Sequence, residues 1–257
     1  MTVRRILLAV VLLIGATSES SAQRRQREDA PPRADPKNNI PYDGRFVFAR
    51  IMYDIQPFGF DQFGRGDIKW DHDYPRAEQN FTRILREITT LRPFVEGGNV
   101  FTLDDPELMK YPVAYMAEPG FWNMSDKEAA SLRNYLLKGG FVIFDDFAGN
   151  QWFNFERQIR RVLPELRLVK LDVGHPIFDA FYRIESIEFN HPYFDVPSQF
   201  YGIFEDNDPS RRLLAIINYN NDMSEYWEWS DVGLFPVALS NEAYKLGVNY
   251  VIYAMTR

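Results

Sequence analysis

The 257-residue chain contains no cysteine. This absence excludes disulfides, thiolate zinc sites, iron–sulfur clusters and every mechanism that depends on a thiolate nucleophile. Histidine is scarce too, with three in the whole chain, so few imidazole groups are available for acid–base or metal chemistry. The fold must therefore be stabilised by its core, for which 46% hydrophobic and 16% aromatic residues supply the material.

A basic surface stripe is also missing. The formal net charge is −7, and the one basic run is QRRQRED at residues 23–29. Nucleic-acid binding needs clustered Lys and Arg that displace counterions, so we expect no nucleic-acid partner. The Walker A loop, the Gly-rich dinucleotide fingerprint, the Gly-x-Ser-x-Gly elbow and His-Glu-x-x-His are absent as well, which excludes the standard forms of those sites.

The apolar run near the N-terminus is too short to span a bilayer comfortably. ILLAVVLLIGA at residues 6–16 follows the basic start MTVRR and precedes the small residues SSA. This pattern predicts a secretory signal peptide over residues 1–22, and hence a periplasmic or secreted protein without a membrane span after cleavage. An uncleaved anchor is the alternative, and Arg4-Arg5 leaves Sec and twin-arginine export both open.

The rest of the chain divides into a linker and one domain. Residues 23–44 are rich in Pro, Arg and other polar residues, which predicts a disordered linker. Residues 45–257 are enough for a single domain and contain no internal repeat.

Apolar runs and helical periodicities alternate along this domain. We expect strands at 46–54, 100–103, 111–118, 141–147, 200–205 and 213–219. We expect four helices, at about residues 75–91, at 125–138, from about residue 150 and from about residue 241. A Ser125–Glu128 capping box opens the helix at 125–138. The alternation predicts a three-layer, doubly wound α/β fold with a mostly parallel sheet and some antiparallel additions in the C-terminal half.

Acids and amides follow four of these strands. They are Asp54, then Glu118, then Asp145 and Asp146, and finally Asn218, Asn220, Asn221 and Asp222. Because the carboxyl ends of parallel strands meet at one edge, where open α/β sheets bind ligands, we predict a shared polar cleft there. The alternative is that each residue only makes a turn or caps a helix, and Asp222-x-x-Glu225 itself has the form of a capping box.

Two features of this edge stay open. Neighbouring residues of a strand point to opposite faces, so only one of Asp145 and Asp146 can face the cleft, and the sequence does not say which. Tyr226, Trp227 and Trp229 add rings beside the acids, which is typical of sugar and cation sites, although core packing is the alternative for at least one Trp. The predicted ligand-binding residues are Asp54, Glu118, Asp145, Asp146, Asn220, Asp222, Tyr226 and Trp227.

The three histidines carry weaker signals. His175 and His191 each precede a proline, where capping or loop packing is as good an interpretation as function. His72 lies in Asp71-His72-Asp73, but consecutive loop residues rarely converge on one metal, so we interpret this triplet as solvated charge. We predict no metal site and no cofactor. The candidate catalytic residues are Asp145, Asp146 and His175.

Five longer stretches resemble a known family. YDIQPFGFDQFGRGDIKWDHDYPRAEQNF, GGFVIFDDF, GHPIFDAFY, INYNNDMSEYWEW and EAYKLGVNYVIYAMT together are similar to the bacterial domain-of-unknown-function family 4159, over about residues 45–257. The resemblance implies a flavodoxin-like, class I glutamine-amidotransferase-like fold and no established activity. True amidotransferases need a cysteine at the strand-to-helix elbow, where this chain has Asp145, Asp146 and Phe147, so glutaminase chemistry is excluded.

Two classes of function fit these observations. The first is a non-catalytic binding or assembly module that recognises a glycan, a polar small molecule or an envelope protein through the acidic and aromatic cleft. The alternative is a hydrolase or lyase that uses carboxylates, with or without a metal, on a sugar-like substrate. We favour the first, because the amidotransferase nucleophile is missing and no metal-ligand spacing is convincing. The sequence carries no signal of oligomeric state.

Overall fold

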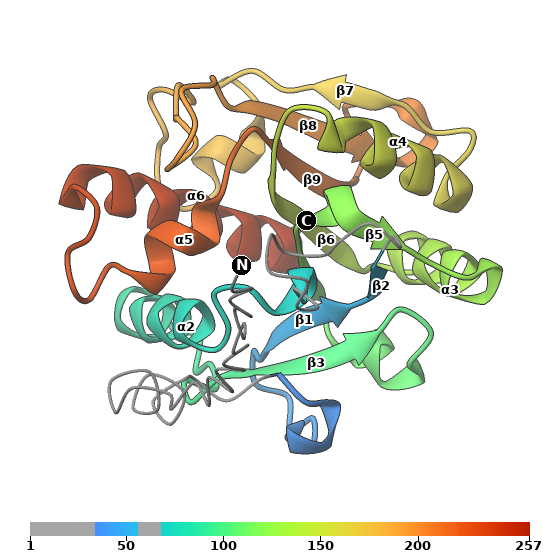
Figure 1. Cartoon of the computed structure of the whole chain (residues 1–257), viewed down its shortest axis with the longest axis horizontal. Coiled ribbons are helices and arrows are strands. Elements are labelled where there is room, and N and C mark those ends of the chain that lie inside the picture. The colour runs from blue at the N-terminus through green and yellow to red at the C-terminus, as the bar shows by residue number, and fades with distance from the viewer. Residues whose placement is uncertain (1–33, 56–67) are drawn as a thin grey trace, which may run out of the picture. The chain divides into compact units, whose positions relative to one another are not determined.

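The computed structural model describes residues 34–55 and 68–257, and its centre is a seven-stranded mixed sheet (Figure 1). The strands are β1 (Phe48–Met52), β3 (Gly98–Thr102), β4 (Val113–Ala117), β6 (Phe141–Phe147), β7 (Leu168–Lys170), β8 (Gln199–Phe204) and β9 (Leu213–Tyr219). They lie in the order β3-β1-β4-β6-β9-β8-β7. The first five are mutually parallel, whereas β8 pairs antiparallel with β9 and with β7. The predicted α/β fold with a mostly parallel sheet is confirmed.

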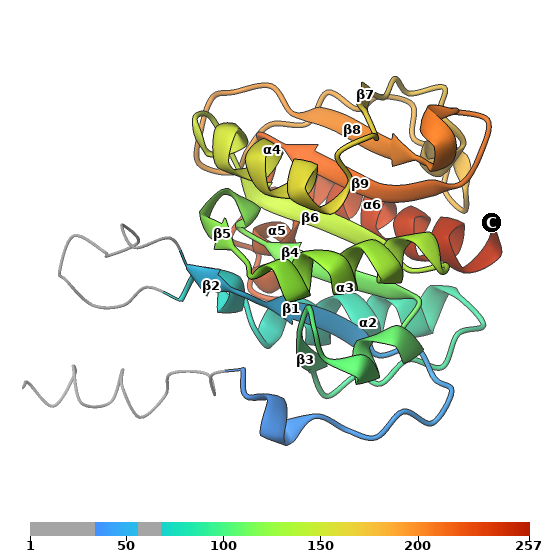
Figure 2. The same ribbon diagram turned by 90° about the vertical axis from the view of Figure 1, so that its right-hand side faces the viewer.

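Helices cover both faces of the sheet. Helices α2 (Arg76–Ile88), α5 (Met223–Glu228) and α6 (Val237–Thr256) lie on one face, and α3 (Asp126–Leu137) and α4 (Gln151–Val162) lie on the other (Figures 1 and 2). In β4, Tyr115 packs in the cluster that contains α2, α5 and α6, whereas Ala114 and Met116 pack in the cluster that contains α3 and α4. Burial on both faces explains why the central strands are almost continuously apolar.

Several shorter elements complete the fold. The strands β2 (Asp54–Ile55) and β5 (Trp122–Asn123) form a small antiparallel pair. The 3₁₀ helices are η1 (Pro36–Asn38), η2 (Lys69–Asp71), η3 (Pro106–Lys110), η4 (Pro119–Phe121), η5 (Pro176–Asp179) and η6 (Glu205–Asn207). The predicted capping box at the start of α3 is present, with Ser125 and Glu128 bonded to each other's backbone N–H groups. Helix α6 begins at Val237, a turn earlier than predicted, directly after Pro236.

The segment before β1 is partly ordered, although its composition predicts a linker through residue 44. Asn39 exchanges two hydrogen bonds of 2.7 Å with the backbone of Val100, and the amide of Asn99 bonds the backbone of Ile40 in return. The Asn39 side chain thereby satisfies backbone groups on the outer edge of β3, and the Asn99 side chain of β3 satisfies those of Ile40. Residues 39 and 40 are therefore tied to the edge of the sheet.

The predicted signal peptide and the first part of the linker lie outside the described residues. Within the described residues, no helix is both long enough and apolar enough to cross a membrane.

Candidate functional site

A cavity of about 270 Å³ lies at the carboxyl ends of the parallel strands. Three of the predicted residues line it, namely Glu118 after β4, Asp146 near the end of β6 and Asp222 after β9. They converge because strands that run in parallel end at the same edge of the sheet. Further walls come from residues that the sequence-based prediction left out, namely His72, Asp73, His191, Tyr193 and Glu225.

Three neighbouring strands end with a residue in the left-handed backbone region. The φ angle is 44° at Glu118, 61° at Asp146 and 57° at Asn220. This conformation costs a residue with a side chain roughly 1–2 kcal/mol, and such residues cluster at functional sites. The register between β6 and β9 shifts between Phe144 and Phe147, and this irregularity takes Asp146 out of the regular alternation of the strand.

Asp145 is fully buried and does not line the cavity. Its carboxylate accepts hydrogen bonds from the Tyr115 hydroxyl at 2.9 Å and the Asn218 amide at 3.0 Å. It also accepts from the backbone N–H groups of Met223 at 2.8 Å and Ser224 at 3.3 Å. Burial raises the pKa of Asp145 to about 6, against the opposing effect of these donors. Asp145 therefore anchors the start of α5, and Asp146 is the member of the pair that faces the cavity.

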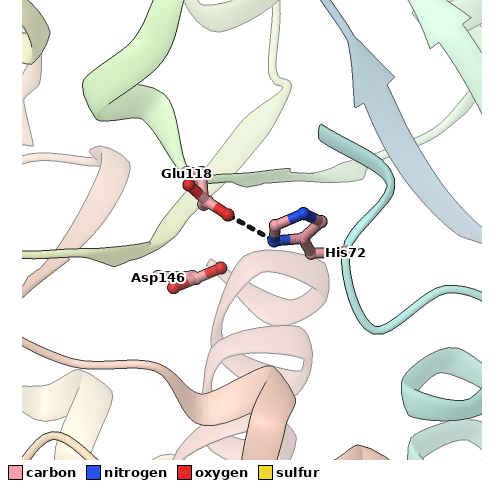
Figure 3. Close-up of side chains that lie close together, drawn as sticks. All are labelled: His72, Glu118 and Asp146. Atoms are coloured by element: carbon pink, nitrogen blue, oxygen red, sulfur yellow. Dashed lines mark ion pairs between the residues drawn. The ribbon is translucent and has the colours of Figure 1, made fainter. Parts of the chain in front are cut away.

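Asp146 lies beside an ion pair between Glu118 and His72 (Figure 3). The Nζ atom of Lys69 lies 3.4 Å from the carboxylate of Glu118. Within residues 34–55 and 68–257, the carboxylate of Asp146 has neither a hydrogen-bond donor nor a cationic partner. Burial raises the pKa of Asp146 well above its usual value, and the negative charge of Glu118 is the next cause. The charge of Asp146 is thus poorly compensated by the protein.

A further group of acids adjoins this cavity. Asp73, Glu225 and Glu228 each place a carboxylate oxygen within 4.8 Å of the other two. Asp73 accepts from the Ser224 hydroxyl at 2.6 Å, and the Tyr193 hydroxyl donates to Glu225. Burial raises the pKa of Glu228 to about 8, followed by the charge of Asp73. Burial and the neighbouring negative charges therefore favour the protonated form of Glu228.

His191 completes the opposite wall. Its side chain is 7% exposed, and its Nδ1 atom accepts from the backbone N–H of Tyr193 at 3.2 Å. Burial lowers the pKa of His191 to about 4, so the ring is neutral and carries its proton on Nε2. A ring nitrogen of His191 lies within 4.8 Å of carboxylate oxygens of Asp146 and Asp222.

Asp222 has two roles at this wall. As the N-cap of α5, its carboxylate accepts from the backbone N–H of Glu225 at 2.9 Å, as the capping-box pattern suggested. It also lines the cavity, and burial raises its pKa well above the usual value, with the charge of Asp146 as the next cause. Capping and a position in the cavity are therefore compatible at this residue.

Three of the predicted ligand-binding residues lie away from the cavity. Asp54 is exposed on β2, where it pairs with Asn123. Tyr226 and Trp227 are buried in the core, and the Trp227 ring packs against Phe81 with centroids 4.6 Å apart. For Trp227 the core-packing alternative is the correct one, and Tyr226 is buried as well, because α5 turns both rings toward α2 and α6 rather than toward the strand ends.

Asn220 also does not line the cavity. Its Oδ1 atom accepts from the backbone N–H of Gly149 at 3.1 Å, and its Nδ2 atom donates to the carbonyl of Pro197 at 3.3 Å. The side chain ties together two loops near the strand ends and contributes to their shape.

His175 lies at the opposite edge of the sheet. It caps η5 by accepting from the N–H of Ile177 at 3.2 Å, and its ring packs against Phe204. Phe204 pairs with Leu213, the first residue of β9, whereas Asp222 follows the last. The candidate catalytic residue His175 therefore does not lie with the strand-end carboxylates, because β8 runs antiparallel and the end of β8 that His175 packs against lies away from the cavity.

The adjacent residues His72 and Asp73 were not predicted to form a site, and they join different groups. His72 lies with Glu118 and Asp146, whereas Asp73 lies with Glu225 and Glu228. The two neighbours do not converge on one point, and each lies instead with acids that are distant in the sequence. The available signal was the position of this loop, since any loop after a parallel strand begins at the ligand-binding edge.

Two of the side-chain groups have the composition of metal sites. His72, Glu118 and Asp146 form one, and Asp146, His191 and Asp222 form another, each with ligand atoms within 4.8 Å of one another. One imidazole and two carboxylates suit a divalent first-row ion. Such groups were not expected from the sequence.

A larger groove of about 700 Å³ lies between α2 and α6. Ile84, Tyr182, Val237 and Tyr244 are among the residues that line it. It lies away from the strand ends, and in the described part of the chain none of the imidazole–carboxylate groups opens into it. The smaller cavity is the better candidate site because its side chains provide the chemistry.

The resemblance noted in the sequence is borne out by comparison with known families. Residues 47–255 match the model of a domain of unknown function, DUF4159. A search among curated proteins found no match. Because the match covers most of the chain, this protein belongs to the DUF4159 family.

Proposed function

We propose that this protein is a non-catalytic binding module that holds a small polyhydroxylated molecule, such as the end of a glycan, in the cavity at the strand ends. One observation carries the proposal: carboxylates of Glu118, Asp146 and Asp222 share a single cavity with aromatic rings. Carboxylates accept hydrogen bonds from sugar hydroxyls, and rings cover the apolar faces of a sugar. The rings in the wall are Phe121, Phe147, Tyr193 and Phe194.

The size of the cavity favours a small molecule over an envelope protein as the ligand. Its volume of about 270 Å³ is close to the lower end of the roughly 300–1,000 Å³ that is common for small-molecule sites. A protein partner would instead require an extended surface.

The strand order supports a flavodoxin-like, class I glutamine-amidotransferase-like fold. The five parallel strands lie side by side in the order β3, β1, β4, β6 and β9. When these five are renumbered 1 to 5 along the chain, the order across the sheet is 2-1-3-4-5. This is the order of flavodoxin-like sheets, which bind ligands where the strand order reverses, here between β1 and β4. Glu118 at the end of β4 and His72 in the loop region after β1 are close to that point.

The basic and apolar start of the chain supports export as part of the same proposal. A periplasmic or secreted location would bring the cavity to envelope glycans and soluble sugars.

A carboxylate-based hydrolase is the second candidate, and one observation favours it. Burial and like charge raise the pKa values of Asp146 and Asp222 well above normal, so one of the two can hold a proton while the other is ionised. Most glycoside hydrolases use such a pair, with one protonated carboxyl group as the acid and one carboxylate as the base or nucleophile. A cysteine-dependent glutaminase is excluded, because the chain has no thiol.

Titration calorimetry with mono- and disaccharides and cell-wall fragments tests the binding proposal. We expect wild-type protein and Asp54→Asn to bind the same sugar, and Asp146→Asn to lose about tenfold or more in affinity, since a charged hydrogen bond contributes roughly 1.5–3 kcal/mol. Asp54→Asn is the matched control because it makes the same chemical change on exposed β2. Equal binding by both variants would place the ligand elsewhere, and release of free sugar from a bound disaccharide would favour the hydrolase.

A further inference from the structure

We propose that His72, Glu118 and Asp146 bind one divalent first-row transition ion, such as Mn²⁺ or Zn²⁺, and that this ion is the group to which ligand hydroxyls attach. The ion site stands on the geometry of the three side chains alone. Its link to a polyhydroxylated ligand rests on the proposed function.

The three side chains converge from segments that are far apart in the sequence. His72 follows η2, Glu118 follows β4 and Asp146 lies in β6, and their side chains lie together in Figure 3. The ligand atoms are within 4.8 Å of one another, and Nδ1 of His72 contacts an oxygen of Glu118. Ligands of one ion at about 2.1 Å stand roughly 3–3.5 Å apart, so small side-chain rotations are enough to surround an ion.

The charge in the cavity also calls for a cation. The described residues offer the Asp146 carboxylate no donor and no cation, while the carboxylates of Glu118 and Asp222 lie close to it. Removing a carboxylate from water without compensation is costly. A divalent ion would neutralise this charge, part of which Lys69 and His72 offset at Glu118.

His191 provides a second and independent indication of a ligand. The residue is more than nine-tenths buried, it lines the cavity, and its Nε2 atom, which is open to the cavity, has no hydrogen-bond partner among the described residues. An imidazole N–H that faces a cavity can donate to an acceptor held there. A hydroxyl or water held by an ion at Asp146 would supply one.

The position of the proton on the His191 ring also decides which of two groups binds the ion, His72–Glu118–Asp146 or Asp146–His191–Asp222. Because Nδ1 of His191 accepts from the Tyr193 N–H, the neutral ring presents a protonated nitrogen, and not a lone pair, to Asp146 and Asp222. His191 is thus a hydrogen-bond donor to the bound ligand. His72 is the imidazole that coordinates the ion.

The donor set determines the class of ion. Ca²⁺ and Mg²⁺ prefer sites made only of oxygen ligands, whereas one imidazole with two carboxylates suits Mn²⁺, Fe²⁺, Co²⁺ or Zn²⁺. The three protein ligands leave positions open for two adjacent hydroxyls of a sugar.

The test uses the full chain, freed of metal by a chelator and titrated calorimetrically with Mn²⁺ or Zn²⁺, with Mg²⁺ as comparison. We expect one transition ion to bind per chain, and Mg²⁺ to bind more weakly. The affinity for the transition ion should fall about 100-fold in His72→Ala and in Asp146→Asn, because loss of a direct ligand should cost at least as much as the largest losses known for outer-shell residues. Asp54→Asn should bind as the wild type does. Circular dichroism of each variant shows that it is folded.

The failures of the two proposals can be told apart. Absence of transition-metal binding by the folded wild type, or unchanged binding in both His72→Ala and Asp146→Asn, would overturn the ion site. Sugar binding that persists in excess chelator would overturn the role of the ion while the binding function stands. Metal binding lost in these variants, with no sugar bound in any condition, would support the ion site and remove the proposed function.

Discussion

Asp145 and Asp146 are neighbours in β6, yet their carboxylates serve different parts of the molecule. Asp145 is fully buried and accepts four hydrogen bonds, two of them from the backbone N–H groups of the first residues of α5 and two from Tyr115 on β4 and Asn218 on β9. Asp146 has a φ of 61° and lines the cavity that also contains Glu118 and Asp222. One residue therefore maintains the fold of the site, and the other is available to a ligand.

This division of roles predicts opposite effects on stability. Asp145→Asn should lower the free energy of unfolding by about 3 kcal/mol, because it removes charged hydrogen bonds and turns amide hydrogens toward buried donors. Asp146→Asn should leave the free energy of unfolding unchanged or raise it, because it removes one of several like charges. Urea unfolding of the two variants measures the difference. A loss for Asp146→Asn as large as that for Asp145→Asn would contradict the assignment.

The buried ion pair Arg50–Glu78 connects the core to the backbone at His72. Its Nε and Oε1 atoms are 2.5 Å apart, both side chains are fully buried, and Nη1 of Arg50 donates to the carbonyls of Trp70 and His72 at 2.9 Å. Glu78→Gln should cost roughly 3–5 kcal/mol, since it leaves a buried charge without its partner. It should also weaken Mn²⁺ binding, because Arg50 holds the backbone at His72.

The exposed pair Arg45–Asp43 supplies the control for that experiment. Asp43→Asn should leave the free energy of unfolding close to that of the wild type, because solvent and salt screen an exposed pair, and it should leave metal affinity unchanged. Chemical unfolding and calorimetry on both variants provide the comparison. Similar effects of the two substitutions would show that burial of Arg50–Glu78 has no special consequence.

The acidic side chains in and beside the cavity should make the free energy of unfolding depend on pH. Burial, with nearby like charge, raises the pKa of Glu228 to about 8 and those of Asp146 and Asp222 well above normal. A carboxyl group whose pKa is higher in the folded state takes up a proton on folding, so its stabilising contribution is lost as the pH rises through the folded value. The metal-free protein should therefore lose stability from about pH 6.5 to 8.5.

Two features of that pH experiment make it decisive. The pKa of His191 is lowered to about 4 by burial, so this residue reduces stability only below about pH 6.5 and does not act in the chosen window. Addition of Mn²⁺ should flatten the decline, because an ion replaces the protons. A melting temperature that is constant or rises across this range without metal would contradict the charge balance inferred for the cavity.

Gly247 in α6 is packed so closely that a larger side chain should not fit. A Cβ atom there would lie 2.6 Å from Cζ2 of Trp227 and 2.7 Å from Cε2 of Phe81. Helix propensity alone would make Gly247→Ala stabilising by up to about 1 kcal/mol, but the crowding against α2 and α5 should make it destabilising by about 1–3 kcal/mol. Thermal unfolding decides the sign, and a raised melting temperature would show that the rings have room to move.

The sheet and its helices were predictable because their patterns are local. The apolar runs of β4 and β6 are continuous since both faces are buried, and the Ser125–Glu128 capping box marks the start of α3. The gathering of Glu118, Asp146 and Asp222 followed from the parallel arrangement alone.

The rest of the site depends on features that residue type does not specify. The choice between Asp145 and Asp146 depends on the shift of register in β6 and on a left-handed backbone, neither of which has a sequence signature in DDF. The position of His175, away from the cavity, depends on the antiparallel direction of β8, and an apolar run does not reveal the direction of its strand. His191 lies in an irregular segment, where no periodicity indicates which way the chain turns.

Anomalous diffraction from crystals of the protein grown with Mn²⁺ tests the central claim most directly. The account predicts an anomalous peak bounded by Nδ1 of His72 and the carboxylates of Glu118 and Asp146, with the Nε2 atom of His191 facing a molecule bound at the ion. A map with no peak between these side chains, from crystals in which Mn²⁺ is bound only at exposed acids elsewhere, would contradict it.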